Sequence, residues 1–486
     1  PNIYFEKNIS LIIPYTIHAW TVSKKNCEVV SFPTLPMRRN GICLFKRKTD
    51  IALFSKQNPL VPYSIFCSFP LPNPAFWTLS AIWAAWLFGK KEATNMLKTI
   101  SQQRYGWYWF AQAIATSLSS VQNEITENKK VFGMCSGFTS SYLLAILLGA
   151  SNANFLLNGC AVQSDTQTIQ FIWQPSPHKK NEERVEQLEP ARQQLINYLA
   201  ERAEPATFHE LFVVYSAAPS IHCADLSSLK KESSDYYQKV IHDLHSELDD
   251  SKTFQLFKGP TASSSRWMLV THEEKNFPLD DRIEQEVVNA IYRESRINFP
   301  DLYSSLCEIF CSFLTPERNF CKACLESYAT CVDHISQHYE RDSKEEPQLR
   351  EQEKHEIADL INETGKKIGV TVHHNDEIVW LNEQGKPLYH FFFSTTAIFS
   401  PSILCEREKP GGIPVFIFPA SRSRLIVLKK NRNPYLKEIL EEHWHLLKFR
   451  QVRKISEQEQ FSLQAWQDLL DVDPPLWEAP TQMKIL

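Results

Sequence analysis

The chain has 486 residues, of which 43% are hydrophobic and 12% aromatic, and its formal net charge is −4. This length predicts about three or four domains, and the apolar content excludes a mainly disordered chain. The weak negative charge excludes a general attraction to phosphate. Contact with a nucleic acid therefore has to come from a local basic patch.

Cysteine usage and hydropathy bear on the cell compartment. Twelve cysteines are spread along the chain without a secretory signal, which predicts reduced thiols in the cytoplasm. The most apolar stretch, Phe76 to Phe88, is shorter than the roughly 18 to 20 residues that span a bilayer. We therefore expect a buried helix there and no membrane partner. Because the chain opens on Pro1 and not on methionine, we also expect residues upstream of it.

Residues 1–178 alternate strand-like and helix-like runs, which predicts an α/β domain. The loop after the strand-like run Tyr63 to Phe69 reads Asn73-Pro74-Ala75-Phe76. Taken with Phe76 to Gly89, Arg104 to Trp109 and the strand Val131 to Met134, this loop resembles the C-terminal half of prokaryotic adenine-specific DNA methylases over roughly residues 60–175. On its own, the loop is better described as a proline-rich turn between a strand and a helix; its surroundings favour the resemblance.

The resemblance implies a methyltransferase-like, Rossmann-type fold with Asn73 and Phe76 at the methyl-acceptor pocket. There the polar side chain would accept hydrogen bonds from the target amine, and the ring would stack on a flipped base. Ala75 stands where the family has its second proline, and no glycine-rich loop for S-adenosylmethionine is visible. We expect no activity; the alternative is an S-adenosylmethionine-dependent adenine-specific DNA methyltransferase whose cofactor loop lies upstream or on a partner chain.

Two helical segments follow. Residues 181–274 contain three helical runs and two strand-like runs, which is the order of a winged helix: Arg184 to Ala203, His209 to Tyr215, Tyr236 to Leu248, Thr253 to Phe257 and Arg266 to Val270. The third helix carries Lys239 but also Asp243 and Glu247, so protein binding and a structural spacer remain alternatives. Residues 277–338 contain three more helices, at 281–294, 300–310 and 316–331, and predict a second module of this type. We find no internal repeat.

Four cysteines of the second module form two close pairs, Cys307 with Cys311 and Cys321 with Cys324. Four thiolates can hold zinc tetrahedrally. Both pairs, however, fall within helical runs without the glycine-bearing turns of zinc ribbons. We therefore expect no metal site, with zinc binding as the alternative.

A charged stretch, residues 339–355, is expected to be a solvated linker. Beyond it, residues 356–486 return to an α/β pattern. The runs Glu377 to Trp380, Tyr389 to Ile398 and Val415 to Pro419 resemble a PD-(D/E)XK restriction-endonuclease-like fold. This resemblance implies carboxylates at the positions of Phe391 and Phe393.

Nuclease chemistry of that kind needs two or three carboxylates around Mg²⁺. Phenylalanine cannot bind a hard cation, and alternate strand residues share a face, so Phe391 and Phe393 predict an apolar core instead. Asp376 and Glu377 are too few for a site, and nothing in the sequence places Glu406. We expect a nuclease-like domain without catalytic acids.

Between positions 422 and 454 there are ten basic and three acidic residues, interleaved with Tyr435, Trp444 and Phe449. This pattern is typical of phosphate-binding surfaces, although a solvated basic face over buried aromatics would look the same. The predicted DNA-binding residues are Arg422, Arg424, Lys429, Lys430, Arg432, Lys448, Arg450, Arg453 and Lys454.

Taken together, the sequence predicts a multi-domain α/β protein that is DNA-associated and catalytically inactive, as a component of a DNA modification or restriction-type system. Its expected partners are DNA and other proteins of a modification or defence system. No cofactor is expected, or S-adenosylmethionine if the methylase interpretation holds. A protein-binding scaffold is the remaining alternative.

Overall fold

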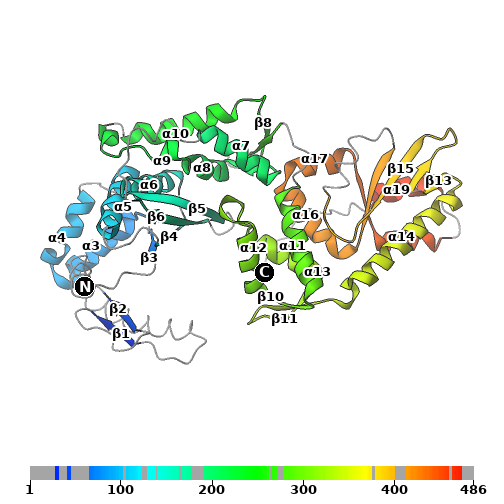
Figure 1. Ribbon diagram of the computed structural model, residues 1–486, viewed down its shortest axis with the longest axis horizontal. Helices are drawn as coiled ribbons and strands as arrows, with labels where there is room; N and C mark the ends of the chain where they lie inside the picture. The colour runs from blue at the N-terminus through cyan, green and yellow to red at the C-terminus, as the bar shows by residue number, and fades with distance from the viewer. Residues whose placement is uncertain are drawn as a thin grey trace. The chain divides into compact units, whose positions relative to one another are not determined.

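The chain is a multi-domain α/β protein (Figure 1). Its structure is a computed structural model, which describes residues 28–31, 41–44, 65–69, 71–101, 106–122, 129–137, 139–163, 167–176, 190–231, 233–259, 261, 264–270, 277–374, 378–399, 412–458 and 462–472. The chain divides into two compact units. Unit 1 comprises residues 1–158, 170–188 and 222–237, and unit 2 comprises residues 159–169, 189–221 and 238–486.

Most of a four-stranded sheet, in the order β3-β4-β6-β5, lies in unit 1. Strands β3 and β4 are parallel. A separate pair, β1 and β2, is also parallel. The helix α6 is almost wholly buried from Leu143 to Ser151 and packs on α5. Gly149 permits this packing, because a Cβ there would lie 2.8 Å from the Ala111 carbonyl oxygen. The elements are β1 (Glu28–Ser31), β2 (Gly41–Leu44), β3 (Ile65–Ser68), α3 (Pro74–Phe88), α4 (Lys90–Ser101), α5 (Trp107–Gln122), β4 (Val131–Ser136), α6 (Ser140–Asn152), β5 (Phe155–Gln163) and β6 (Thr168–Pro175).

The first helical module belongs mainly to unit 2. Its three-stranded antiparallel sheet has the order β7-β9-β8, so the short strand between the first two helices pairs with the last strand of the hairpin. The helix expected from residue 184 begins at Ala191 among the described residues. The elements are α7 (Ala191–Arg202), β7 (Ala206–Thr207), α8 (Phe208–Ser216), α9 (Pro219–His222), α10 (Ser233–Leu248), β8 (Phe254–Phe257) and β9 (Arg266–Leu269).

Apart from the four-residue helix α9, the second helical module has the same order of helices and strands, and its sheet has the corresponding order β10-β12-β11. The helix that we expected to reach Cys331 ends at Tyr328, and the chain continues as a hairpin, because β-branched Thr330 and Val332 favour a strand. The elements are α11 (Leu279–Arg293), β10 (Arg296–Asn298), α12 (Phe299–Ile309), α13 (Arg318–Tyr328), β11 (Ala329–Asp333) and β12 (His338–Arg341).

The two modules are therefore a structural repeat, which the sequence analysis did not detect. In both, a strand leads directly into the second helix through a capping residue, a phenylalanine, an acidic residue and a leucine. The segments are Thr207-Phe208-His209-Glu210-Leu211 and Asn298-Phe299-Pro300-Asp301-Leu302. Thr207 accepts a hydrogen bond from the Glu210 N–H, and Asn298 accepts one from the Asp301 N–H. These caps satisfy the first free N–H groups of each helix.

The C-terminal domain of unit 2 has a five-stranded mixed sheet, β13-β14-β15-β16-β17. Strand β14 is antiparallel to both of its neighbours, β13 and β15, whereas β15, β16 and β17 run parallel to one another. The elements are α14 (Pro347–Ile368), β13 (Thr371–His374), β14 (Ile378–Leu381), β15 (Pro387–Phe393), β16 (Ile413–Phe418), α16 (Ser423–Arg432), α17 (Pro434–Glu442), β17 (His445–Lys448), α18 (Phe449–Ser456) and α19 (Leu463–Val472).

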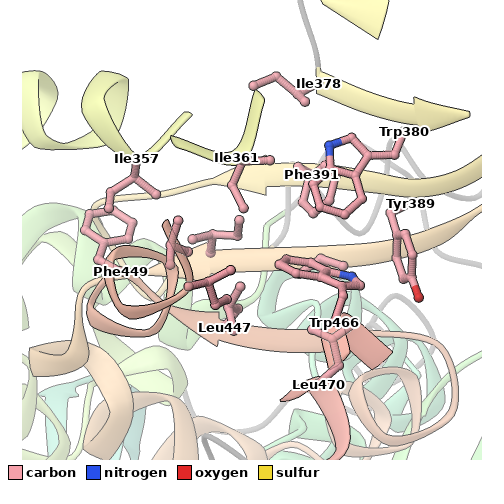
Figure 2. Packing of buried hydrophobic residues seen from close by; sticks show 14 residues of the cluster. Ile357, Ile361, Ile378, Trp380, Tyr389, Phe391, Leu447, Phe449, Trp466 and Leu470 are labelled. Carbon is pink, nitrogen blue, oxygen red and sulfur yellow. The ribbon is translucent and has the colours of Figure 1, made fainter. Parts of the chain in front are cut away.

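One aromatic cluster forms the core of this domain. Figure 2 shows Trp380 of β14, Phe391 of β15 and Trp466 of α19 gathered on one face of the sheet, with Ile357 and Ile361 of α14 lining the same core. Trp380 and Trp466 are completely buried. The large rings explain why a sheet with only 4 to 7 residues per strand has a continuous interior.

The predicted solvated linker, residues 339–355, is wrong. Residues 338–341 form β12, residues 343–345 form a 3₁₀ turn, and α14 begins at Pro347. Glu345 and Arg350 are buried, so this charged segment is part of the interior. Of the helices that the structure describes, none combines the length and the apolar character that crossing a bilayer requires.

Candidate nucleic-acid interface

The basic residues predicted to bind DNA lie mainly on α16 and α18, and the structure buries several of them. Arg422 is 0% exposed and Lys429 is 1% exposed, and Lys430 and Lys448 are also buried. A phosphate cannot reach a side chain with no accessible surface. The expectation of one continuous basic surface from these nine residues is therefore wrong, and the reason lies in acidic partners from other parts of the chain.

Lys429 is held by two carboxylates of the second helical module. Its Nζ lies 2.5 Å from Asp281 Oδ1 and forms an ion pair with Glu284 Oε2. It also donates to the Ala397 carbonyl oxygen at 3.0 Å. Burial alone would lower the pKa of Lys429, but Asp281 and Glu284 outweigh it and raise that pKa above its ordinary value. The lysine is an internal cation.

The same two carboxylates hold the loop after β15. Glu284 Oε1 accepts a hydrogen bond from the Ala397 N–H at 2.7 Å, and Asp281 Oδ2 accepts one from the Phe399 N–H at 3.3 Å. Glu284 also accepts from the Tyr328 hydroxyl. The Ser-Thr-Thr segment that follows β15 is thus fixed to α11 by charge-assisted hydrogen bonds.

Arg422 has its partners in the charged segment that we expected to be a linker. Its Nη2 lies 2.5 Å from Glu345 Oε2, and its Nε donates to the Thr395 carbonyl oxygen at 3.0 Å. The guanidinium carbon sits 3.5 Å from the centre of the Tyr328 ring. Glu345 also pairs with Arg350. This bridge joins α16, β15 and the start of α14.

Arg432, at the end of α16, is bound in the same way. It pairs with Asp280 at 2.8 Å and with Glu317 at 2.5 Å, and it lies over the Phe320 ring. Lys430 pairs with Glu441 at 2.6 Å. The acids around Arg432 come from α11 and from the residue before α13.

Only part of the predicted set remains accessible. Arg424 is 87% exposed and lies 3.8 Å from Glu326, and Arg450 and Lys454 on α18 are exposed. Arg453 is partly exposed and pairs with Glu353 at 2.6 Å. Scattered cations of this kind offer isolated phosphate contacts and no continuous track.

A second group of charges lies where the two helical modules meet α16. Arg202 pairs with Glu204 at 3.2 Å and with Glu210 at 3.0 Å, and Glu204 accepts from the Asp280 N–H. Burial and the nearby Asp280 carboxylate raise the pKa of Glu204 to about 7, against the attraction of Arg202. For Glu210 burial also acts upward, but Arg202 and Thr207 lower its pKa to about 2.

This group encloses a small polar cavity, lined by Tyr198, Arg202, Glu210, Asp280, Glu317 and Arg432 among others. The Nε of Arg202 is buried there without a hydrogen-bond partner among the described residues. Buried donors of this kind usually bind ordered water. The cavity combines both signs of charge, so its chemistry is that of an internal ion-pair network.

The two residues of the predicted methyl-acceptor pocket are at the start of α3. Asn73 caps this helix, and its side-chain oxygen accepts the Phe76 N–H at 2.9 Å. Pro74 occupies the first helical position, which suits its fixed φ. The Phe76 ring is 60% exposed. The side-chain oxygen that would hold the target amine is thus already used by the helix.

The four cysteines do not converge. Cys321 and Cys324 are buried within α13, Cys307 is half-buried, and Cys311 is exposed. Burial raises the pKa of the Cys324 thiol, which favours the neutral form over the metal-binding thiolate. Within the described ranges, no group of three or more His, Cys, Asp or Glu side chains is placed to hold a metal ion.

The positions where the endonuclease resemblance implies acids belong to the apolar core. Phe391 is 3% exposed, and its ring lies 4.8 Å from that of Trp380 and 5.8 Å from that of Trp466 (Figure 2). Phe393 is half-buried and packs against the same cluster. Asp376, Glu377 and Glu406 lie outside the described residues.

Both helical modules carry accessible polar side chains that are not among the predicted DNA-binding residues. On α10, Lys239, His242 and Ser246 are exposed at helical spacing and share a face. Glu247, an acid expected to repel phosphate, forms an ion pair with Arg192. In the second module the exposed polar residues include Asn319, Lys322 and Glu326 on α13 and His334 in the hairpin turn.

Comparisons with known proteins give no relative on which to base a function. The chain matches no family model, no curated protein and no solved structure. The residues of the site are therefore the basis for the function proposed below.

Proposed function

We propose that this chain is a DNA-associated protein without catalytic activity, of the kind that works in a DNA modification or restriction-type system. The repeated module carries the proposal. Leaving aside the four-residue helix α9, two consecutive segments have the order helix, strand, helix, helix, hairpin, with the strand orders β7-β9-β8 and β10-β12-β11. This is the order of a winged helix, which places its third helix against DNA and its hairpin on the backbone.

The surface of the first module supports the proposal. The exposed side of α10 presents Lys239 and His242, and Lys252 and Lys258 are exposed on either side of β8. Glu247 and Asp250 are both paired with Arg192, which reduces their repulsion of phosphate. Lysines on the helix and on the hairpin match the two points at which a winged helix touches a duplex.

The C-terminal domain supports the lack of catalysis. Its mixed sheet is compatible with a restriction-endonuclease-like fold, but an aromatic core fills the positions of Phe391 and Phe393. For unit 1 we propose a methylase-like domain that has also lost its activity. In it, Asn73 and Phe76 belong to the capped start of α3 instead of an acceptor pocket. An active methyltransferase would need Asn73 to exchange its cap for a substrate.

Duplex binding by the full chain tests the proposal. We expect fluorescence anisotropy of a labelled duplex to give an affinity that falls steeply with salt, because each phosphate contact releases counterions. Lys239→Glu with Lys258→Glu should weaken binding about tenfold at low salt, which corresponds to about 1.4 kcal/mol, and should reduce the salt slope by about 2. The matched control is Lys386→Glu, which reverses an exposed lysine of the C-terminal domain.

Equal weakening by the control would contradict a specific role for α10 and its hairpin. Absence of duplex affinity at low salt would contradict DNA association altogether, and would favour a protein-binding scaffold. Cleavage of the duplex in magnesium buffer would contradict the absence of nuclease chemistry.

A further inference from the structure

Helix α3 has two apolar faces. None of its 15 residues is charged. Ala81 and Ala84 are buried, whereas Phe76, Leu79 and Trp83 are more than half exposed. Six exposed large side chains recur at helical spacing and share one face of the helix. They are Phe76 (60%), Leu79 (53%), Ile82 (54%), Trp83 (53%), Trp86 (84%) and Leu87 (64%).

This arrangement is unusual for a protein surface. A helix that is hydrophobic all round is normally buried, and contiguous exposed patches of several hundred Å² mark interaction sites. Helix α4 packs on α3 and covers part of it. The exposed fractions above describe the apolar face that α4 leaves accessible, which we name the α3 face.

The area of the α3 face is that of a protein interface. Aromatic side chains have about 150–250 Å² to bury, and with about 150 Å² for each leucine or isoleucine the exposed fractions sum to roughly 650 Å². A stable complex of standard size buries about 600–1,000 Å² on each partner. The face also contains two tryptophans and a phenylalanine, residue types that are enriched at interface centres.

We infer that the α3 face packs against the α3 face of a second copy of this chain in a two-fold dimer. A two-fold interface uses the same patch on both subunits, so the patch has to be complementary to itself. An uncharged apolar helix meets this condition, because like charges do not oppose each other across the axis. Lys90 and Lys91 follow the helix directly. In an antiparallel crossing they lie at opposite ends and remain in solvent.

Sedimentation velocity of the full chain over a concentration series tests this inference. We expect a species of twice the 56.3 kDa chain mass. Trp86→Glu and Leu79→Glu should each raise the dimer dissociation constant at least about 100-fold, because each buries an unpaired charge at the interface centre. The matched control is Ile335→Glu, at a 97% exposed apolar residue in the hairpin of the second module, which should leave the dimer unchanged.

A second measurement covers the case in which a charged variant misfolds. A photo-crosslinking amino acid at position 83 should crosslink two copies, and the crosslinked peptide should map to residues 74–88. A monomer at tens of micromolar, a dimer that survives both α3 variants, or a crosslink to another part of the chain would each overturn the inference. So would binding of the monomer to anionic phospholipid vesicles through Trp83 and Trp86, since the face would then serve a membrane.

Discussion

Helices α16 and α3 reverse the positions that their compositions predict. Helix α16 is rich in arginine and lysine, and the sequence favours a solvent-exposed, DNA-binding surface, yet Lys429 is 1% exposed. Helix α3 is entirely uncharged, and the sequence favours a buried helix, yet Trp86 is 84% exposed. The local composition indicates whether a buried segment requires counter-charges or apolar contacts. It does not indicate which part of the molecule supplies them.

The two helices differ in the contacts that the rest of the chain provides for them. For α16 the partners are within unit 2, because α11 supplies Asp280, Asp281 and Glu284 about 150 positions earlier in the chain. For α3, the structure describes apolar cover on one face only. We therefore expect substitutions in α16 to act on folding and substitutions on the α3 face to act on association.

The largest expected effect comes from removing the internal cation. Lys429→Met leaves Asp281 and Glu284 buried without their counter-ion, and breaking a buried ion pair in this way costs about 3–5 kcal/mol. Urea unfolding followed by circular dichroism measures the loss. Lys437→Met, the same substitution at an exposed position on α17, should change the free energy of unfolding by less than about 0.5 kcal/mol.

The interpretation of α16 also predicts a recovery. Lys429→Met combined with Asp281→Asn and Glu284→Gln removes the uncompensated charges and should regain part of the lost stability. If Lys429→Met and Lys437→Met have the same small effect, Lys429 is not an internal cation and the contrast between α16 and α3 disappears.

The elements that sequence reasoning found are those with local signals. Short, nearly continuous apolar runs predict β15 and β16, and Asn73-Pro74 marks the start of α3 through a cap and a fixed φ. The absence of acids at Phe391 and Phe393 is also a local property, and the packing of Phe391 agrees with the expected apolar core. Strand β12 was missed because its hairpin follows a helix without a glycine or proline between them.

There is a physical reason why the burial of the predicted DNA-binding residues could not be predicted from the sequence. Whether Arg422 reaches solvent depends on Glu345, and whether Lys429 does so depends on Glu284, both far away in the sequence. A count of charges within residues 422–454 includes none of these partners. The acidic residues of α11 were available as a signal, because three carboxylates within five residues of an amphipathic helix require cations when its apolar face is buried.

Substitution of an apolar core residue should give a second large loss of stability. Phe391→Ala removes a ring that contacts Trp380 and Trp466, and loss of a buried phenylalanine costs about 3–5 kcal/mol. Phe393→Ala, at the half-buried neighbour on the same strand, should cost less. Denaturant unfolding compares the two variants; an equal cost would mean that Phe391 is not at the centre of the core.

The charges around Arg202 predict a dependence of stability on pH. The pKa of Glu204 is raised to about 7 by burial and by Asp280, from an ordinary value of 4.5. A raised carboxyl pKa means that the folded state binds the proton more tightly. This contribution is fully present below pH 4.5 and is lost as the pH rises through about 7. The loss is on the order of 3 kcal/mol, because one pKa unit corresponds to about 1.4 kcal/mol.

Glu210 acts in the opposite direction, because its pKa is lowered from 4.5 to about 2 and its contribution is lost as the pH falls from 4.5 through about 2. The variant Glu204→Gln should therefore flatten the decline of stability between pH 4.5 and about 7 and leave the acid side unchanged. Thermal unfolding at a series of pH values measures the stability in both pH ranges. If stability declines equally in Glu204→Gln, a group other than Glu204 causes the decline.

The smallest expected effect is at the start of α3, where structural and catalytic roles of one residue can be separated. Asn73→Ala removes the acceptor of the Phe76 N–H, and loss of an N-cap costs about 0.5–2 kcal/mol. Asn73→Ser keeps a capping oxygen and should restore most of that stability, since serine caps about as well as asparagine.

A methyl-acceptor role would separate the two substitutions differently, because serine is shorter than asparagine and has no amide. Transfer of labelled methyl groups from S-adenosylmethionine to DNA should be absent in the unmodified chain and in both variants. Transfer that Asn73→Ala abolishes would show that the capped turn is a working site, and that α3 is exposed in order to receive a base and not only a second copy of the chain.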